Sequence, residues 1–259
     1  MGEPGEERVW ITGASSGIGR ATALRFVRAG AIVLASGRDA AALDRLRADA
    51  AAAAGPGHGE VRCHSVDVTD RAAVLQAVSE IEAADGPIDR AILNAGTYEP
   101  VAAAAFDATS FDRQFAVNVG GTVNCLQALL PAMRARRQGQ IAIVGSLSGY
   151  RGLPRASAYG ASKAALMRIA ESLRQDQHDA GLDIRLISPG FVRTPLTDRN
   201  DFAMPFLMAA DAAAERIHRG LVRGRRFEIA FPRRFAALVR LGSIMPYGLY
   251  FPLVRKVTG

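Results

Sequence analysis

Short apolar runs alternate with longer amphipathic stretches along the chain as far as residue 190. Short runs predict strands buried on both faces, whereas apolar residues at helical spacing predict helices. Strands that alternate with helices favour an α/β fold with a parallel sheet and helices on both of its faces. We expect strands at 9–12, 31–35, 61–66, 88–93, 140–144 and 183–187, and helices at 20–29, 39–54, 70–84, 111–136 and 156–180.

Several of these helices have recognisable boundary residues. Asp39 and Asp70 stand where N-caps are expected, because a short carboxylate accepts hydrogen bonds from the free N–H groups of a first turn. Gly120 and Gly121 fall within the long helix at 111–136 and predict that it forms in two pieces. Further along we expect a mobile substrate lid with an apolar inner face at 196–210, a helix at 211–223, a strand at 227–231 and a basic, aromatic extension at 232–259.

The composition is that of an ordinary globular protein, and its 259 residues fit a single domain spanning 1–259. The polar, acidic start lacks the basic and apolar regions of a signal peptide, and no apolar run approaches the roughly 20 residues that cross a bilayer. Cys63 and Cys125 lie far apart and outside any metal-ligand cluster. We therefore expect a reduced, cytoplasmic protein in which both cysteines are small core residues.

The net charge of +7 comes almost entirely from one block near the carboxyl end. Residues 215–256 contain nine Arg and one Lys against two Glu, a local balance of +8, so the rest of the chain carries −1. A basic block without a nucleic-acid motif does not indicate nucleic-acid binding. The simplest interpretation of the extension is packing on its own domain with solvated arginines. Peripheral contact with an anionic membrane and contact with a partner subunit are the alternatives.

A glycine-rich turn follows the first strand and opens a helix, in the sequence Thr-Gly-Ala-Ser-Ser-Gly-Ile-Gly at 12–19. Glycine allows a tight turn and close approach of the backbone to a pyrophosphate, and the helix N-terminus offers free N–H groups. The strand–turn–helix context favours a dinucleotide site over a merely structural turn. The residues expected to hold the cofactor here are Gly13, Ser15, Ser16, Gly17, Ile18 and Gly19.

The end of the second strand bears on which dinucleotide binds. An acid there would bind ribose hydroxyls and favour NAD(H), but the chain has Arg38, whose guanidinium suits a 2′-phosphate. Ser15 and Ser36 are expected to add hydroxyl donors, and Asp39 is interpreted as the helix cap. We therefore expect NADP(H) rather than NAD(H). Other positions expected to contact the cofactor are Asp67 and Val68 at the adenine, and Asn94, Ala95 and Gly96 in the turn after the fourth strand.

Tyr159 and Lys163 are the most informative pair, because residues four apart share one face of a helix. A neighbouring ammonium stabilises a phenolate, so Lys163 is expected to lower the pKa of Tyr159 and make it an acid–base catalyst. With five Tyr and two Lys in the chain, chance predicts only about 0.04 such pairs.

Two further polar residues complete a candidate site. Ser146 follows the fifth strand and can bond a substrate carbonyl oxygen, with Ser148 as a weaker competitor for that role. Asn118 lies in an apolar helical stretch, where it either kinks the helix or holds a water molecule.

These pieces together resemble the short-chain dehydrogenases/reductases, in the same order from residue 8 to about 195. The resemblance implies a doubly wound Rossmann-type parallel sheet of about seven strands, and hydride transfer between a nicotinamide and a carbonyl or alcohol. It also implies a homodimer or homotetramer that pairs through the helices at 111–136 and 156–180. The matching pieces are 12–19, 94–96, Asn118, Ser146, Tyr159 with Lys163, and 188–194.

The resemblance further implies a role for each residue of the site. Tyr159 protonates the nascent alkoxide and Ser146 orients the carbonyl. Lys163 binds the ribose and tunes Tyr159, and Asn118 anchors a water molecule of a proton relay. Pro189 and Thr194 lie against the nicotinamide.

The expected function is an NADP(H)-dependent oxidoreductase acting on a lipophilic carbonyl or alcohol. The alternatives are an NAD-dependent alcohol dehydrogenase and a nucleotide-sensing binding protein on the same fold. The intact set of four polar residues argues against the binding protein.

Overall fold

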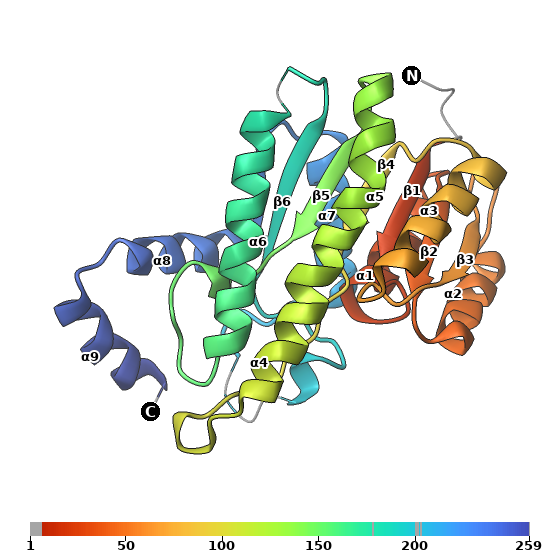
Figure 1. The fold of residues 1–259 in the computed structure, drawn as a ribbon. Coiled ribbons are helices and arrows are strands. Elements are labelled where there is room, and N and C mark those ends of the chain that lie inside the picture. The colour runs from red at the N-terminus through yellow and green to blue at the C-terminus, as the bar shows by residue number, and fades with distance from the viewer. Residues whose placement is uncertain (1–6, 178, 200–201, 203, 259) are drawn as a thin grey trace.

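The computed structural model describes residues 7–177, 179–199, 202 and 204–258. It contains a seven-stranded parallel sheet in the order β3-β2-β1-β4-β5-β6-β7 (Figure 1), which confirms the expected doubly wound α/β fold. The chain enters at β1, moves outward to β3, returns to β4 beside β1 and then moves outward to β7. The strands are β1 (Arg8–Thr12), β2 (Ile32–Gly37), β3 (Val61–Ser65), β4 (Arg90–Leu93), β5 (Gln140–Val144), β6 (Asp183–Pro189) and β7 (Glu228–Phe231).

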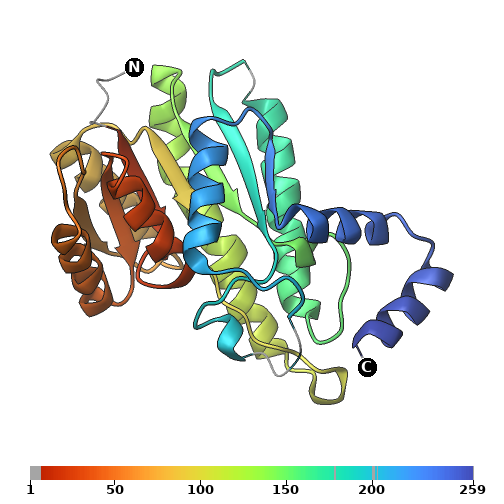
Figure 2. The same cartoon turned by 180° about the vertical axis from the view of Figure 1, so that it is seen from behind.

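Helices cover both faces of the sheet (Figures 1 and 2). Buried residues of α3, α5 and α6 pack on one face, and those of α1, α2 and α7 pack on the other. The helices are α1 (Gly17–Val27), α2 (Ala40–Ala52), α3 (Arg71–Asp85), α4 (Ala108–Phe115), α5 (Gly121–Arg136), α6 (Ser157–Asp176), α7 (Ala210–Val222), α8 (Arg233–Ser243) and α9 (Tyr247–Thr258). Short turns of other helix types are η1 (Ala103–Ala105), η2 (Ala116–Gly120), η3 (Leu147–Gly149) and η4 (Thr197–Arg199).

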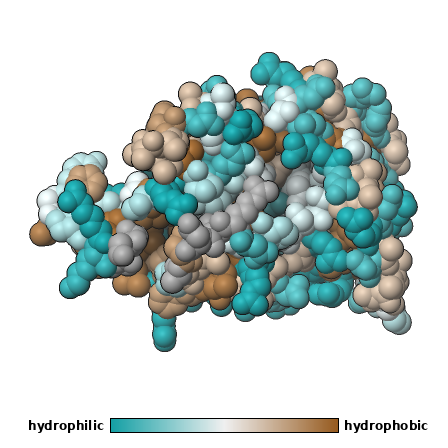
Figure 3. Space-filling view, turned by 90° about the horizontal axis from the view of Figure 1, so that it is seen from below, coloured by the Kyte–Doolittle hydropathy of each residue, from teal (hydrophilic) through white to brown (hydrophobic). Residues whose placement is uncertain are grey.

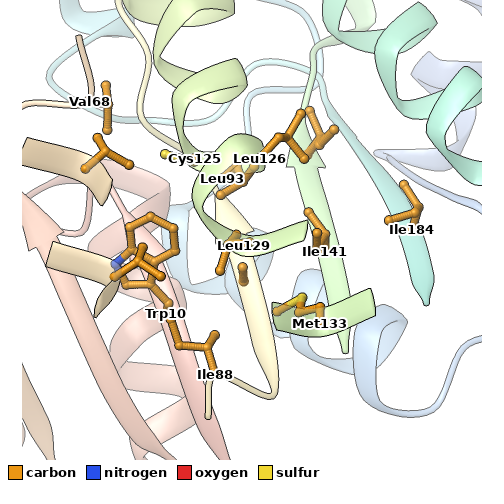
Figure 4. Packing of buried hydrophobic residues seen from close by; sticks show 14 of the residues in the cluster. Trp10, Val68, Ile88, Leu93, Cys125, Leu126, Leu129, Met133, Ile141 and Ile184 are labelled. Carbon is orange, nitrogen blue, oxygen red and sulfur yellow. The ribbon is translucent and has the colours of Figure 1, made fainter. Parts of the chain in front are cut away.

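The core between the sheet and α5 is built around large apolar side chains. Trp10 on β1 has no exposed surface, and Leu129 and Met133 of α5 belong to the same cluster (Figure 4). Full burial of side chains of this size is the main favourable term in folding, at about 1.5–3 kcal/mol each. The neighbouring Cys125 lies in this cluster as a free thiol, as expected, whereas the free thiol of Cys63 is only partly buried.

Both expected N-caps are present. Asp39 accepts a hydrogen bond from the Ala42 N–H at 2.9 Å, and Asp70 accepts one from the Ala73 N–H at 3.0 Å. Two other boundaries differ from expectation. Helix α1 begins at Gly17 inside the glycine-rich turn, because glycine fits both the turn and a first helical residue. Helix α6 ends at Asp176 rather than at residue 180, since the chain already turns back there towards β6.

The expected break in the long helix is present, because the π-helical turn η2 at Ala116–Gly120 separates α4 from α5, which begins at Gly121. A π-helical turn inserts an extra residue into the helix and often marks a functional position. Gly121 is needed for close packing, because a Cβ atom there would lie only 2.5 Å from Val68 Cγ2. Its glycine lets α5 pack closely against the loop that follows β3.

The carboxyl-terminal region contains structure that the sequence pattern did not predict. The expected helix and strand near 211–231 are present as α7 and β7, but the extension also forms two helices, α8 and α9. Figures 1 and 2 both show α8 projecting from the body at the end of β7 and α9 folding back from its tip. Among the described residues, no helix is long and apolar enough to cross a membrane.

The expected lid at 196–210 is described only in part, because residues 200, 201 and 203 lie outside the described residues. The lid begins with η4, and Met208 forms an isolated bridge with Val192. Two of the large apolar side chains of the lid, Phe202 and Phe206, are 46% and 49% exposed rather than covered by an inner face.

Candidate active site

The carboxyl ends of the central strands open on one cleft of about 380 Å³. This volume lies within the usual range for ligand pockets, and the position beside the β1–β4 switch point is the usual one for doubly wound sheets. All the predicted site residues line it except Gly19, Ser36 and Asn118. Those that line it are Gly13, Ser15, Ser16, Gly17, Ile18, Arg38, Asp67, Val68, Asn94, Ala95, Gly96, Ser146, Tyr159, Lys163, Pro189 and Thr194.

The glycine-rich turn forms a cradle in which no Cβ atom fits. Gly13 has φ +66°, and a Cβ atom there would lie 2.9 Å from Ala95 Cα. Gly19 lies beneath the turn, where a Cβ atom would come within 2.2 Å of the Gly13 carbonyl oxygen. Ser16 precedes α1 without capping it through its side chain, so the first N–H groups of the helix remain available. This arrangement fits the pyrophosphate of a dinucleotide.

Arg38 marks the far end of the cleft. Its side chain is 72% exposed, and its guanidinium nitrogen lies 4.0 Å from an Asp67 carboxylate oxygen. Partial burial raises the pKa of Asp67, but hydrogen bonds from Thr69 and the charge of Arg38 outweigh it, so the pKa is lowered overall. Asp67 is therefore a carboxylate beside Arg38 at neutral pH.

Ser15 and Ser36 have different surroundings, although both were expected to face the cofactor. Ser15 lines the cleft, and its hydroxyl would lie 3.3 Å from a Cβ atom placed on Gly37. The expectation for Ser36 was wrong, because its hydroxyl is buried and accepts a hydrogen bond from the Trp10 indole at 2.8 Å.

At the end of the cleft opposite Arg38, the polar groups lie around Tyr159. Tyr159 and Lys163 lie on successive turns near the start of α6, and the Lys163 ammonium is 5.6 Å from the centre of the Tyr159 ring. Ser146 caps η3 after β5, and its hydroxyl lies 2.7 Å from that of Ser148 and also bonds the Tyr159 hydroxyl. The buried Lys163 donates to the Val144 carbonyl at 2.9 Å.

Burial dominates the ionisation of this pair. It raises the pKa of Tyr159 to about 12, although the hydrogen bond from Ser146 acts in the opposite direction. Burial also lowers the pKa of Lys163 to about 8. The expected lowering of the Tyr159 pKa by Lys163 is therefore not found in the cofactor-free protein, because burial of the phenol disfavours its charged form more strongly than the bond from Ser146 favours it. A neutral phenol at physiological pH can donate a proton.

Asn118 holds the loop after β4 and does not line the cleft. Its side-chain carbonyl accepts from the Thr97 N–H at 2.7 Å, and its amide donates to the Thr97 carbonyl at 3.1 Å and the Ser162 hydroxyl at 2.9 Å. Its own backbone carbonyl accepts from the Thr122 hydroxyl at 2.8 Å. The side chain is fully buried and its groups are all bonded within the protein.

Comparison with known proteins agrees with this geometry. The sequence model of the short chain dehydrogenase family matches residues 7–203. The chain belongs to the short-chain dehydrogenase family. An uncharacterized oxidoreductase from Myxococcus xanthus is 38% identical over 257 residues, which cover 99% of this chain and all of the relative.

Solved structures of the family are similar in fold and contain nicotinamide dinucleotides. A short-chain dehydrogenase/reductase from Burkholderia phymatum, solved with NAD, has a TM-score of 0.83 and 26% identity, and covers 93% of this chain and 94% of its own. A short-chain dehydrogenase from Sphingobium yanoikuyae, solved with NADPH, has a TM-score of 0.78 and 27% identity, and covers 93% and 97%. The protein is thus an oxidoreductase of a family whose members bind NAD or NADPH.

The structure of this dehydrogenase also places residues at the site that sequence reasoning missed. The ring of Tyr98 packs edge-on against that of Tyr159, with centroids 5.1 Å apart. Phe191 stacks on Phe235 of α8 at 5.7 Å, and Phe235 stacks on Phe206 at 5.6 Å. No local pattern signals these contacts, because they join segments far apart in the chain. These four aromatic residues pack around the site without lining the cleft; residues that do line it and were missed include Gly37, Thr97, Gly190, Pro195, Leu196 and Thr197.

Proposed function

We propose that this chain is an NADP(H)-dependent oxidoreductase that transfers a hydride between a nicotinamide and a lipophilic carbonyl or alcohol. The observation that carries the proposal is the convergence of Tyr159, Lys163 and Ser146 in the same cleft as the glycine cradle. A binding protein would need the cradle but not these three groups. We propose that the whole chain forms one catalytic domain that works in the cytoplasm. We also propose that it assembles as a homodimer or homotetramer, in which α4–α5 and α6 form the contacts between subunits.

The chemistry at the catalytic end follows from the protonation of its groups. A bound NADPH would supply the hydride at the carbonyl carbon. Tyr159, held neutral by burial, donates its proton to the carbonyl oxygen as negative charge develops there. Ser146, whose single O–H bonds Tyr159 in the cofactor-free protein, can turn that O–H to the substrate oxygen when a carbonyl binds. Lys163, protonated below pH 8, adds positive charge near the resulting phenolate.

The preference for NADP(H) rests on the end of β2. Arg38 is free to reach a phosphate because its contact with Asp67 is long, and Ser15 lies beside it across Gly37. Asp39, the acid next to Arg38 in the sequence, is occupied as the cap of α2. A guanidinium and a hydroxyl favour a 2′-phosphate over free ribose hydroxyls.

The lipophilic substrate class rests on the aromatic side chains beside the nicotinamide end. Gly190 lines the cleft, and a Cβ atom there would lie 2.9 Å from the ring of Phe235. Phe235 is in turn stacked between Phe191 and Phe206. These stacked aromatic rings add apolar area and few hydrogen-bonding groups beside that end of the cleft, so they favour an apolar substrate.

An NAD-dependent alcohol dehydrogenase is the second candidate. It is supported by Asp67, whose carboxylate lies near Arg38 and competes with a phosphate for that charge. The NAD-bound relative of similar fold is consistent with it.

The test is a panel of carbonyls and alcohols, from short polar compounds to long-chain and sterol-like ones, followed by nicotinamide absorbance with each dinucleotide. We expect turnover of apolar carbonyls with NADPH and a much lower kcat/KM with NADH. Faster oxidation of alcohols with NAD than reduction with NADPH would favour the second candidate. Binding of either dinucleotide without turnover of any compound would contradict the proposal.

A further inference from the structure

The helices α8 and α9, with the link between them, form a projecting C-terminal arm of residues 233–258. The arm carries seven of the fourteen large apolar side chains that are exposed among the described residues. Leu241, Ile244, Tyr247 and Leu249 are each at least 60% exposed. In the view from below, the end of the molecule formed by this arm displays apolar patches beside hydrophilic ones (Figure 3). A cluster of this kind usually marks an interaction surface.

The arm is also strongly basic. No acidic residue follows Glu228 in the sequence, whereas the arm contains Arg233, Arg234, Arg240, Arg255 and Lys256. Arg240 is paired with Glu228. At the base of the arm, Arg226, Arg233 and Arg240 line a hollow of about 360 Å³ in which Glu228 is the acidic residue. The surface therefore combines exposed apolar side chains with a net positive charge.

Contacts with the body hold the arm in place but leave its apolar side chains exposed. Arg151 lies over the rings of Tyr247 and Tyr250, with its guanidinium carbon 4.6 and 4.1 Å from their centres. Tyr250 is 6% exposed, and its hydroxyl donates to the Gly152 carbonyl at 2.7 Å. The arm is thus already packed on its own domain through Tyr250 and the face of Tyr247 that meets Arg151, and that packing does not cover Leu241, Ile244 or Leu249.

A second copy of the chain and an anionic lipid surface are the two candidate partners for this surface. The charge of the arm decides between them. In a symmetric dimer the same patch meets itself, so two arms would bring basic residues against basic residues with no acid of the arm between them. An anionic lipid surface is complementary to both features, because apolar side chains enter the interfacial region while Arg and Lys reach the headgroups. We propose that the C-terminal arm docks this dehydrogenase on anionic membranes.

Docking through this arm places the substrate end of the cleft near the lipid. Phe235, in the first turns of α8, packs against Gly190 and stacks on Phe191. The arm therefore begins where the cleft ends. This step rests on the proposed function, since it gives a lipophilic substrate a short path from the bilayer, but docking itself requires no turnover.

The test is flotation of the full-length protein with vesicles, without cofactor or substrate. Vesicles of phosphatidylcholine with about 30% phosphatidylserine are compared with pure phosphatidylcholine at about 0.1 M salt, where surface charges act over roughly 10 Å. The apolar variant is Leu241→Glu with Leu249→Glu, and the basic variant is Arg255→Gln with Lys256→Gln. Leu75→Glu on α3 is the matched control, since Leu75 is also an exposed leucine.

We expect the wild type and Leu75→Glu to float with the anionic vesicles and not with the neutral ones. Each basic residue near an anionic surface contributes roughly fivefold to partitioning. The basic variant should therefore bind roughly 25-fold more weakly, and the apolar variant at least as weakly. The molar mass of each protein in solution is measured in parallel by light scattering.

Two outcomes would overturn the proposal. One is equal recovery of the wild type and the apolar variant with anionic vesicles. The other is a wild-type oligomer that does not float and that the apolar variant converts to a monomer, which would assign the arm to a second copy. Turnover of a water-dispersed substrate, measured on the same samples, tests the proposed function separately. A wild type that does not float but turns over fully counts against docking alone, and a wild type that floats without turnover counts against the enzymatic proposal alone.

Discussion

The Lys163 ammonium donates to the Val144 carbonyl at 2.9 Å and lies 5.6 Å from the centre of the Tyr159 ring. Lys163 is thus fixed by the end of β5 while facing the proposed proton donor. Its hydrogen bond offsets only part of the cost of burying its charge, since burial lowers its pKa from 10.5 to about 8. In the absence of cofactor this lysine lowers the stability of the fold, a cost that is usual for groups held ready for catalysis.

Replacement of Lys163 by Met should therefore stabilise the cofactor-free protein at pH 7, by about 1–3 kcal/mol. The lysine is charged in both the folded and the unfolded chain below pH 8, so the full cost of its burial applies there. Between pH 8 and 10.5 the folded state loses its proton first, the unfolded state binds more protons, and wild-type stability rises relative to the variant. Urea unfolding from pH 6 to 10 measures this difference. A stability gap that does not change across this range would contradict the assignment.

Removal of the Tyr159 hydroxyl in Tyr159→Phe should lower kcat by 10²-fold or more, because general acid catalysis contributes about 10²–10⁴-fold. Binding of NADPH, followed by its fluorescence, should stay within about tenfold, since a lost neutral hydrogen bond is worth only about 0.5–1.5 kcal/mol. Tyr98→Phe is the control, because it keeps the ring that packs on Tyr159. Unchanged turnover in Tyr159→Phe would remove Tyr159 from the mechanism.

Arg38→Ala should weaken NADPH by about 10- to 100-fold, as expected for loss of a hydrogen bond between charged groups. NADH affinity should change little, because NADH lacks the 2′-phosphate. Calorimetric titration of both dinucleotides gives the comparison, with Arg45→Ala as an exposed arginine of α2 outside the cleft. Equal losses for the two dinucleotides would contradict the phosphate assignment.

Asn118→Ala should lower the free energy of unfolding by about 2–4 kcal/mol, because the partly buried backbone groups of Thr97 lose both their bonds to Asn118 and the buried Ser162 loses one of its two. The exposed amide of Gln76 gives a control in Gln76→Ala, which should change stability by less than about 0.5 kcal/mol. Urea unfolding compares the two variants. A fully stable but inactive Asn118→Ala protein would show that Asn118 serves the reaction rather than the loop after β4.

Sequence patterns predict those parts of the molecule that depend on neighbours along the chain. The caps at Asp39 and Asp70 need only the next helical turn, and the glycine cradle needs a backbone conformation that glycine itself permits. The burial of Ser36 depends instead on Trp10, which belongs to another strand. No pattern near Ser36 carries that information, so a hydroxyl beside the cofactor motif was misassigned.

The helices of the arm were missed for a related reason. Pro252 lies inside α9, and a proline in that position ordinarily ends or bends a helix, so the sequence does not indicate one there. The buried contact that holds it is made by Arg151, almost a hundred residues earlier. Likewise the π-helical turn at Asn118 forms where Thr97 and Ser162 meet that side chain.

Arg151 links the arm to the catalytic loop, which leads to a last prediction. It follows η3 and donates to the carbonyls of Gly242 at 2.8 Å and Ser243 at 3.0 Å, besides lying over two tyrosine rings. Arg151→Ala should free the arm, so amide exchange at 242–250 should rise by at least tenfold, the exchange expected when about 1.4 kcal/mol of local stability is lost. Because the same loop joins Ser146 to Tyr159, kcat/KM should also fall severalfold.

Arg151→Lys separates the two parts of this effect. An ammonium keeps the charge over the rings but cannot reproduce the planar fork that reaches several carbonyls, so exchange should lie between that of the wild type and that of Arg151→Ala. Arg168→Ala, an exposed arginine on α6, should leave both exchange and kcat/KM unchanged. If Arg151→Ala raises exchange in the arm without changing kcat/KM, the arm is held by this arginine but does not position the catalytic loop.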